Sequence, residues 1–212
     1  VRKPLIVDIN KKFNLGSEWI YVKIFCSPLK ASLLLKSVVK PLIESTDFAR
    51  HIRNWHYLRF VDDQKFHLRL RIQLVNINSF DAALRELILM LGKYPEIIDS
   101  YTFDTYQPEV SRYGGPLHHE SALQFFTLDS LHTLRLLEKS KDFGPWAIMK
   151  SIDQYLSDFG LKTSEKATFC ENSTLNYREE YGLKDDKAFA KSIFSKYRSN
   201  KTEIFEAMSN MQ

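Results

Sequence analysis

Two arginines and a histidine alternate with leucine in His67-Leu68-Arg69-Leu70-Arg71. On a β-strand alternate side chains share a face, so His67, Arg69 and Arg71 are expected to form a row with about 6–7 Å between neighbours. Cationic groups in a row repel one another unless an anion lies among them, and guanidinium groups bind carboxylates and phosphates through two parallel hydrogen bonds. The row therefore predicts either an anion-binding site or a solvated sheet face with surface ion pairs.

A second polar segment, residues 106–115, follows the last expected strand, and loops at strand ends commonly hold sites. Glu109 and Arg112 are three residues apart and are expected to meet on one turn, either as an ion pair or as a carboxylate held for proton transfer. Gly114 and Gly115 permit a sharp bend. Because no Walker or dinucleotide fingerprint surrounds the glycines, a structural turn and a functional loop are both compatible with this segment.

The run His118-His119-Glu120 suggests a metal site, but the sequence has neither an HExxH spacing nor a matching Cys/His cluster. A solvated helix start is the favoured interpretation, because adjacent helical histidines point in different directions. Cys26 and Cys170 lack CxxC spacing and are expected to be reduced, which favours a cytoplasmic setting. We therefore expect neither a metal nor a cofactor.

The elements that position these residues follow from the hydrophobic pattern. Strands are predicted over 18–26, 56–61, 66–74 and 97–107, and helices over 28–46 and 78–92. Asn78 or Ser79 is expected to cap the second helix and Gly92 to end it. The order strand, helix, strand, strand, helix, strand predicts an α+β fold of the ferredoxin-like, split βαβ type, with an antiparallel sheet and both helices on one face.

In this fold the helices must cover the leucine-rich face of the 66–74 strand. The opposite face is then expected to carry the basic residues Lys23, Arg59, His67, Arg69 and Arg71. Further helices are predicted over 118–139, 145–159 and 185–208 and are expected to close this face into a cleft. We thus expect one domain with a lead-in at 1–17, a sheet core at 18–110 and a helical extension at 116–212.

The charge distribution is uneven. Residues 1–75 hold 14 Lys and Arg against 6 Asp and Glu, whereas the whole chain of 212 residues has a net charge of only +4. A basic N-terminal part suggests an anionic ligand or partner. No apolar run reaches membrane-spanning length, and residues 1–13 lack the pattern of a secretory signal.

Taken together, these segments resemble the C-terminal domain of lantibiotic dehydratases, which also occurs in proteins of thiopeptide (bacteriocin) biosynthesis. The resemblance extends in order over residues 19–130 and rests on Trp19-Ile-Tyr-Val-Lys23, Leu58-Arg59-Phe60, His67-Leu-Arg69-Leu-Arg71, Tyr106-x-x-Glu109-x-x-Arg112-Tyr113-Gly114-Gly115 and Asp129-Ser130.

The resemblance implies a carbon–oxygen lyase. In that family a separate, larger domain uses glutamyl-tRNA to esterify Ser or Thr of a precursor peptide, and the domain matched here removes glutamate to leave dehydroalanine or dehydrobutyrine. The matching elimination-site residues are Arg69, Arg71, Glu109 and Arg112, with Glu109 either the base or the partner that holds Arg112. Substrate contacts are expected from Lys23, Arg59, His67, Tyr106 and Tyr113.

The implied partners are the glutamylated precursor peptide, a glutamylation domain or subunit and a cyclase; direct nucleic-acid binding by this domain is not expected. The basic strand has no aromatic residues interleaved with its cations, unlike RNA-recognition modules.

The family pattern also includes a histidine in its last helix, whereas no histidine follows Ser140 here. The chain is expected to lack that helix, to receive the histidine from a partner, or to be a non-catalytic peptide-binding subunit. A further alternative is a thiopeptide-type cycloaddition enzyme, although such members tend to lose the Glu-x-x-Arg residues that this chain retains.

Overall fold

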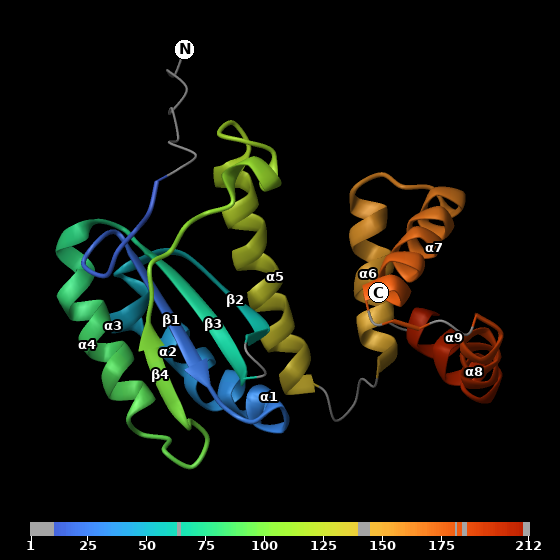
Figure 1. Cartoon of the computed structure of the whole chain (residues 1–212), viewed down its shortest axis with the longest axis horizontal. Coiled ribbons are helices and arrows are strands. Elements are labelled where there is room, and N and C mark those ends of the chain that lie inside the picture. The colour runs from blue at the N-terminus through green and yellow to red at the C-terminus, as the bar shows by residue number, and fades with distance from the viewer. Residues whose placement is uncertain (1–10, 63–64, 140–144, 181, 184–185, 210–212) are drawn as a thin grey trace. The chain divides into compact units, whose positions relative to one another are not determined.

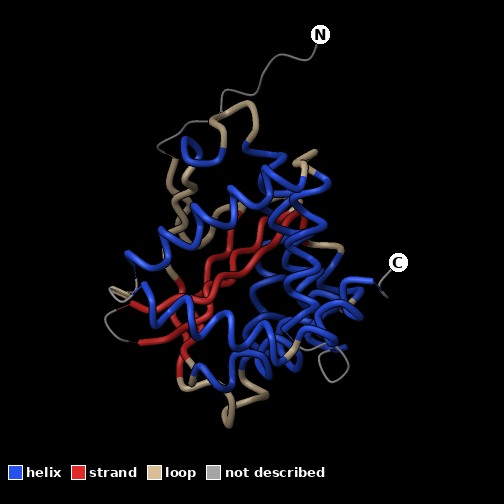
Figure 2. The backbone as a smooth tube through the Cα atoms, turned by 90° about the vertical axis from the view of Figure 1, so that its right-hand side faces the viewer, coloured by secondary structure: helices blue, strands red, loops and turns tan. Residues whose placement is uncertain are grey.

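The sheet has four antiparallel strands in the order β2-β3-β1-β4, which is the predicted ferredoxin-like topology (Figure 1). The computed structural model describes residues 11–62, 65–139, 145–180, 182–183 and 186–209. Its strands are β1 (Trp19–Phe25), β2 (Ile52–Asp62), β3 (Lys65–Leu74) and β4 (Ser100–Phe103). They form the single twisted sheet seen in red in Figure 2.

The connection between β1 and β2 is a segmented helix rather than the predicted continuous one. It consists of η1 (Pro28–Lys30), α1 (Ala31–Leu34), the π-helical turn η2 (Leu35–Val39), α2 (Lys40–Glu44) and α3 (Thr46–Ala49). Pro41 has no N–H, and its ring would clash with the carbonyl of Ser37 in a regular α-helix. The π turn, in which the Lys40 N–H donates to the Leu35 carbonyl, widens the helix just before this proline.

The second crossover contains η3 (Ile77–Ser79) and α4 (Phe80–Leu91), and Gly92 follows α4 as predicted. Ser79, one of the two predicted residues, occupies the N-cap position of α4, but its side chain makes no capping hydrogen bond. β4 is also shorter than predicted. Before it, Ile97 and Ile98 turn into the core, and after it Tyr106 pairs with Phe13 through an isolated bridge.

The main core lies between the sheet and these helices. Strand residues at alternate positions meet apolar side chains of the helical segments and of α4; the fully buried members include Ile20, Val22, Ile24, Leu34, Leu35, Phe48, Leu68, Leu70, Ile72 and Leu87. Burying such side chains stabilises a fold by about 1.5–3 kcal/mol each. The predicted inward face of β3 is therefore confirmed.

The other face of the sheet carries a smaller aromatic cluster. Its buried members are Phe13, Trp19, Tyr21, Tyr106 and Leu123, with Phe126 packed against them. Leu123 and Phe126 belong to α5 (His119–Lys139), which follows the 3₁₀ turn η4 (Val110–Tyr113).

Helix α5 also closes the exposed edge of β2 (Figure 1). The backbone N–H of Trp55 donates to Oγ1 of Thr127 at 3.2 Å, and that of Tyr57 donates to Oγ of Ser130 at 3.3 Å. Further along the helix, Leu134 is buried in the main core. One helix thus contacts both the aromatic cluster and the main core.

The chain divides into two compact units, residues 1–138 and 139–212. The second contains α6 (Pro145–Asp158), α7 (Thr163–Glu180), α8 (Asp186–Ser199) and α9 (Lys201–Ser209). Within it Trp146 donates to Glu203 at 3.2 Å and Lys166 pairs with Asp153 at 2.7 Å. Two features differ from prediction: α7 was not foreseen, and the helix predicted over 185–208 is broken at Asn200.

Within the described residues, no helix combines the length and apolar character that crossing a bilayer requires.

Candidate active site

The register of the sheet places three rows of side chains on the face opposite the main core. One row is His56, Arg71 and Tyr21, the next is Leu58, Arg69 and Lys23, and the third is Phe60, His67 and Phe25. The predicted placement of His67, Arg69, Arg71 and Lys23 on one face is therefore confirmed.

Arg59 is a correction to the predicted set. It pairs with Leu68 and so points to the helix-covered face, where its Nη2 donates to Oγ of Ser32 at 3.1 Å. Residues opposite each other on paired strands point to the same face of the sheet, so the register of β2 against β3 determines the face on which Arg59 lies. The neighbouring residue Leu58 therefore points to the polar face.

The guanidinium of Arg71 lies beside two aromatic rings. Its carbon is 5.0 Å from the ring centre of Tyr106 and 5.3 Å from that of Tyr21. Nη1 contacts Nε2 of His56 at 3.4 Å, and Nε is buried without a hydrogen-bond partner. No carboxylate in the described part of the chain forms an ion pair with Arg71, which leaves its charge uncompensated.

His56 is almost fully buried, with 3% of its surface exposed. Burial, the Arg71 cation and His119 lower the pKa of His56 from 6.5 to about 3. The imidazole is therefore neutral at physiological pH. Tyr106, equally buried, has its pKa raised to about 12 by desolvation, so the phenol is uncharged too.

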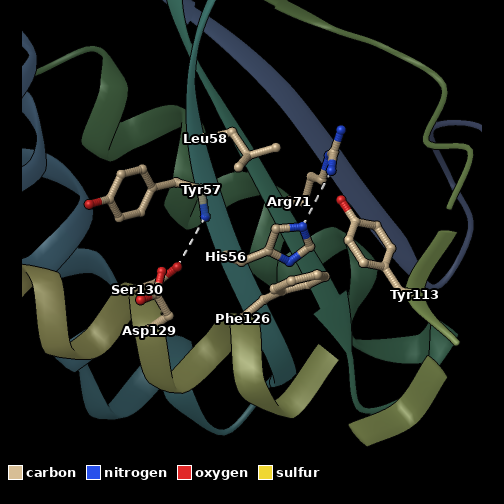
Figure 3. A pocket seen from close by; sticks show the side chains of 8 residues that line it. All are labelled: His56, Tyr57, Leu58, Arg71, Tyr113, Phe126, Asp129 and Ser130. Atoms are coloured by element: carbon tan, nitrogen blue, oxygen red, sulfur yellow. Dashed lines mark hydrogen bonds between the residues drawn. The ribbon is translucent and has the colours of Figure 1, made fainter. Parts of the chain in front are cut away.

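A pocket of about 60 Å³ opens beside these groups (Figure 3). Its lining residues come from β2, β3, η4 and α5; they are His56, Tyr57, Leu58, Arg71, Tyr113, Phe126, Asp129 and Ser130. Such a volume exceeds that needed for one water molecule and suits a small polar group such as a carboxylate. In Figure 3 the hydroxyl of Tyr113 points toward Arg71, while Asp129 and Ser130 lie on α5.

Arg69 has different surroundings from Arg71. Its guanidinium stacks on Phe60, donates from Nε to Nε2 of His67 at 3.2 Å and lies 3.7 Å from the Asp62 carboxylate. Lys23 pairs with Asp104 at 2.7 Å, and this hydrogen bond raises the pKa of the Lys23 ammonium. The positive charges of Arg69 and Lys23 are thus partly compensated by carboxylates, whereas the charge of Arg71 is not.

The predicted contact between Glu109 and Arg112 is present, with 3.3 Å between Nη1 and Oε2. Both side chains are exposed, and neither lines the pocket, although Tyr113, next in sequence to Arg112, does. Gly114 has a left-handed φ of +83°, and a Cβ there would lie 2.9 Å from the Cβ of His118. Glycine is therefore required where the chain turns from η4 into α5.

His118 lies in the turn before α5, which begins at His119, and Glu120 pairs with Arg53 at 2.9 Å. In the described residues, no three His, Cys, Asp or Glu side chains gather where they could hold a metal ion.

Comparison with known proteins identifies the family of the chain. Residues 19–212 match the model of the family described as "Lantibiotic biosynthesis dehydratase C-term". The chain belongs to this family. It is 26% identical over 203 residues to the epidermin biosynthesis protein EpiB of Staphylococcus epidermidis, an alignment that covers 92% of the chain but only 19% of EpiB.

Two solved structures show the same fold as this dehydratase C-terminal chain. The tRNA-dependent lantibiotic dehydratase MibB from Microbispora sp. superposes with a TM-score of 0.58 and 22% identity, over 65% of this chain and 14% of MibB. The pyridine synthase TbtD, from thiomuracin biosynthesis, superposes with a TM-score of 0.62 and 12% identity, over 90% of this chain and 71% of TbtD.

The main site residue that the sequence interpretation missed is His56. It begins the predicted 56–61 strand, so a signal existed: alternation from His56 places it on the face of Leu58 and Phe60. Its pairing with Arg71 follows from the hairpin of β2 and β3, in which Asp62 lies opposite Lys65. Phe126 and Ser130 were missed as site residues because their roles depend on where α5 crosses the edge of β2.

Proposed function

We propose that this chain eliminates glutamate from glutamylated Ser or Thr residues of a precursor peptide, leaving dehydroalanine or dehydrobutyrine. One observation carries the proposal: the uncompensated guanidinium of Arg71 at a small pocket, beside a histidine that is held neutral. Family membership supports a role in lantibiotic dehydration, and the pocket chemistry supports this particular step.

The reaction creates negative charge that needs a positive partner. A base takes the α-proton, the electron pair forms the Cα–Cβ double bond, and the Cβ–O bond breaks to release glutamate as a carboxylate. Charge develops first on the peptide enolate oxygen and then on the leaving group. A preorganised cation in a largely dry site stabilises both, and losing one such group typically costs about 10²–10³ in rate.

Arg71 is the residue best placed to receive this charge. Its aromatic neighbours Tyr21 and Tyr106 exclude water and supply no carboxylate that would compete with the substrate. Arg69 adds positive charge from the next position on the same face of β3. Lys23, which is only partly buried on the same face, can contact the peptide, whereas His67 is fully buried and instead accepts a hydrogen bond from Arg69.

The ion pair between Glu109 and Arg112 supplies a second, exchangeable cation. Exposed ion pairs contribute about 0–1 kcal/mol, so a substrate carboxylate can replace Glu109 as the partner of Arg112 at little cost. In this arrangement Glu109 holds Arg112 until substrate arrives. Tyr113 links their turn to the pocket.

The proposed substrate defines the partners. Glutamylation must precede elimination, so the chain requires a domain or subunit that esterifies the peptide, with glutamyl-tRNA as the glutamate donor. MibB is described as tRNA dependent, which is consistent with this order. A cyclase would use the dehydrated product.

The test is to incubate the chain with a glutamylated Ser/Thr peptide and to follow the product by mass spectrometry. Arg71→Ala is compared with Arg85→Ala, which removes an exposed arginine from α4 on the other side of the sheet. We expect loss of glutamate with wild type and Arg85→Ala, and a glutamylated peptide with Arg71→Ala. A peptide that binds but keeps its glutamate contradicts elimination and indicates a binding role.

A parallel incubation with a peptide that already contains two dehydroalanines tests the TbtD-like alternative. Ring formation from that peptide, without elimination from the glutamylated one, would identify a cycloaddition enzyme instead.

A further inference from the structure

The contact between His56 and Arg71 determines the protonation of the imidazole. Arginine carries only N–H donors, so Nη1 can hydrogen-bond to Nε2 of His56 only if Nε2 offers its lone pair. A neutral imidazole then carries its proton on Nδ1. The 3.4 Å distance describes a long hydrogen bond, which a bound ligand can shorten.

Two buried donors next to this contact lack partners. Nδ1 of His56 and Nε of Arg71 are both inaccessible to water, and neither has a hydrogen-bond partner among the described residues. Buried polar groups are ordinarily hydrogen-bonded, and an unpaired donor is costly. Both residues line the pocket, and the Arg71 cation there favours a ligand that accepts hydrogen bonds and carries negative charge.

The surroundings of His56 disfavour its protonation. Three aromatic rings lie around the imidazole: Phe126 at 5.3 Å, Trp19 at 6.4 Å and Tyr106 at 6.5 Å between ring centres. Arg71 and His119 are the nearby groups that raise the cost of a second positive charge, and Asp129 is the carboxyl group lining the pocket. A cation at His56 would also lose the lone pair that Arg71 requires.

We propose that His56 is a positioning residue that holds Arg71 for binding of a carboxylate. Because Nη1 is engaged by Nε2 of His56 and Nε is closed off from solvent, Nη2 is the guanidinium donor that remains for a charge-assisted hydrogen bond to the ligand. The inference rests on the proposed function for the identity of that carboxylate, the glutamate leaving group. It adds that an uncharged acceptor at residue 56 sets the orientation of the guanidinium.

Three substitutions distinguish the role of the hydrogen-bond acceptor of His56 from the role of its size. His56→Gln places an amide oxygen near the position of Nε2, His56→Asn places its amide near Nδ1, and His56→Phe keeps a ring without any acceptor. If the acceptor at Nε2 matters, only Gln restores function. A purely structural role would instead favour Phe, which fills the space.

The first measurement is the affinity for L-glutamate by NMR titration, with the uncharged diamide of glutamate as the control ligand. We expect wild type and His56→Gln to bind glutamate and not the diamide. His56→Phe and His56→Asn are expected to bind at least about tenfold more weakly, as for loss of one hydrogen bond to a charged group. Equal affinity in His56→Phe, or no glutamate binding by wild type, overturns the inference.

The second measurement is the nitrogen chemical shift of the His56 ring at neutral pH. We expect an unprotonated Nε2 and a protonated Nδ1, with the preference weakened in Arg71→Met. An Nε2–H tautomer or an imidazolium contradicts the inference even where a variant folds poorly.

The two proposals fail in different ways. Binding that depends on residue 56 as described, without elimination by wild type, leaves the positioning role intact and refutes the proposed reaction. Elimination at the same rate in wild type and His56→Phe leaves the reaction intact and refutes the positioning role.

Discussion

The guanidinium carbon of Arg69 lies 3.4 Å from the centre of the Phe60 ring, a neighbour from the adjacent strand. Arg71, two residues further along β3, lies 5.0 Å or more from its aromatic neighbours and has no comparable stack. Arg69 and Arg71, which are alternate residues of β3, therefore have different surroundings. Arg69 is held by a ring, a histidine and Asp62, whereas Arg71 retains binding capacity for a ligand.

Replacing Phe60 by leucine removes the cation–π contact and keeps an apolar side chain. The ring is 40% exposed, so we expect a loss of about 0.5–1 kcal/mol in the free energy of unfolding, measured by urea denaturation. Phe60→Leu in an Arg69→Met background should cost less than in wild type. Equal costs in the two backgrounds would show that the ring contributes only apolar area.

The lowered pKa of His56 predicts a stability change with pH. The unfolded chain takes up a proton near pH 6.5 and the folded chain only near pH 3, so stability is complete above pH 6.5 and decreases as pH falls between these values. The slope for one group is at most about 1.4 kcal/mol per pH unit. Urea unfolding at pH 7, 6, 5 and 4 should show a shallower dependence for His56→Gln.

The pKa values of His67 and His119 are also lowered by burial, so they contribute with the same sign and the His56→Gln curve should not be flat. Identical slopes for wild type and His56→Gln would mean that His56 titrates alike in the folded and unfolded chain.

The hydroxyls that join α5 to β2 should protect the strand edge. Thr127→Val and Ser130→Ala each leave a backbone N–H without its acceptor, at a cost of about 1–3 kcal/mol. Hydrogen exchange should accelerate at Trp55 in the first variant and at Tyr57 in the second.

The matched control is Thr168→Val in α7. Thr168, like Thr127, donates to the carbonyl four residues earlier, but its described hydrogen bonds include none to a strand. If Thr168→Val also accelerates exchange at Trp55, the effect of Thr127→Val does not come from the edge contact.

Glu109 is expected to hold Arg112 rather than to take the α-proton. Glu109→Gln keeps an oxygen that accepts from Arg112, so elimination should stay within about tenfold of wild type. Loss of a general base typically costs about 10²–10⁴ in rate. Initial rates on the glutamylated peptide decide between the roles, and a loss above a hundredfold would make Glu109 the base.

Much of the sheet could be predicted, because a period of two in β1 and β3 separates apolar from polar residues without tertiary information. The order of elements then leads to the observed topology. The placement of Arg59 was predicted wrongly, because its face depends on the pairing of β2 with β3, which sets Arg59 opposite Leu68. The same register brings His56 beside Arg71.

Two helical features also escaped prediction for physical reasons. Most residues of α7 are exposed and its apolar residues are spread around the helix, so it has no stripe of three- and four-residue spacing to detect. At the break, the side chain and the backbone N–H of Asn200 both donate to the Lys196 carbonyl, at 2.7 and 3.2 Å. A local side-chain contact of this kind produces no periodic pattern of apolar residues in the sequence.

Because α5 contacts both faces of the sheet, the wall of the pocket is mechanically tied to the main core. Phe126 at the pocket and Leu134 in the core are eight residues apart on one helix, or about 12 Å along its axis. A rigid rod transmits displacement along its length, so loosening the core at Leu134 would widen the pocket at Phe126. The shape of the pocket thus depends in part on packing on the opposite side of the sheet.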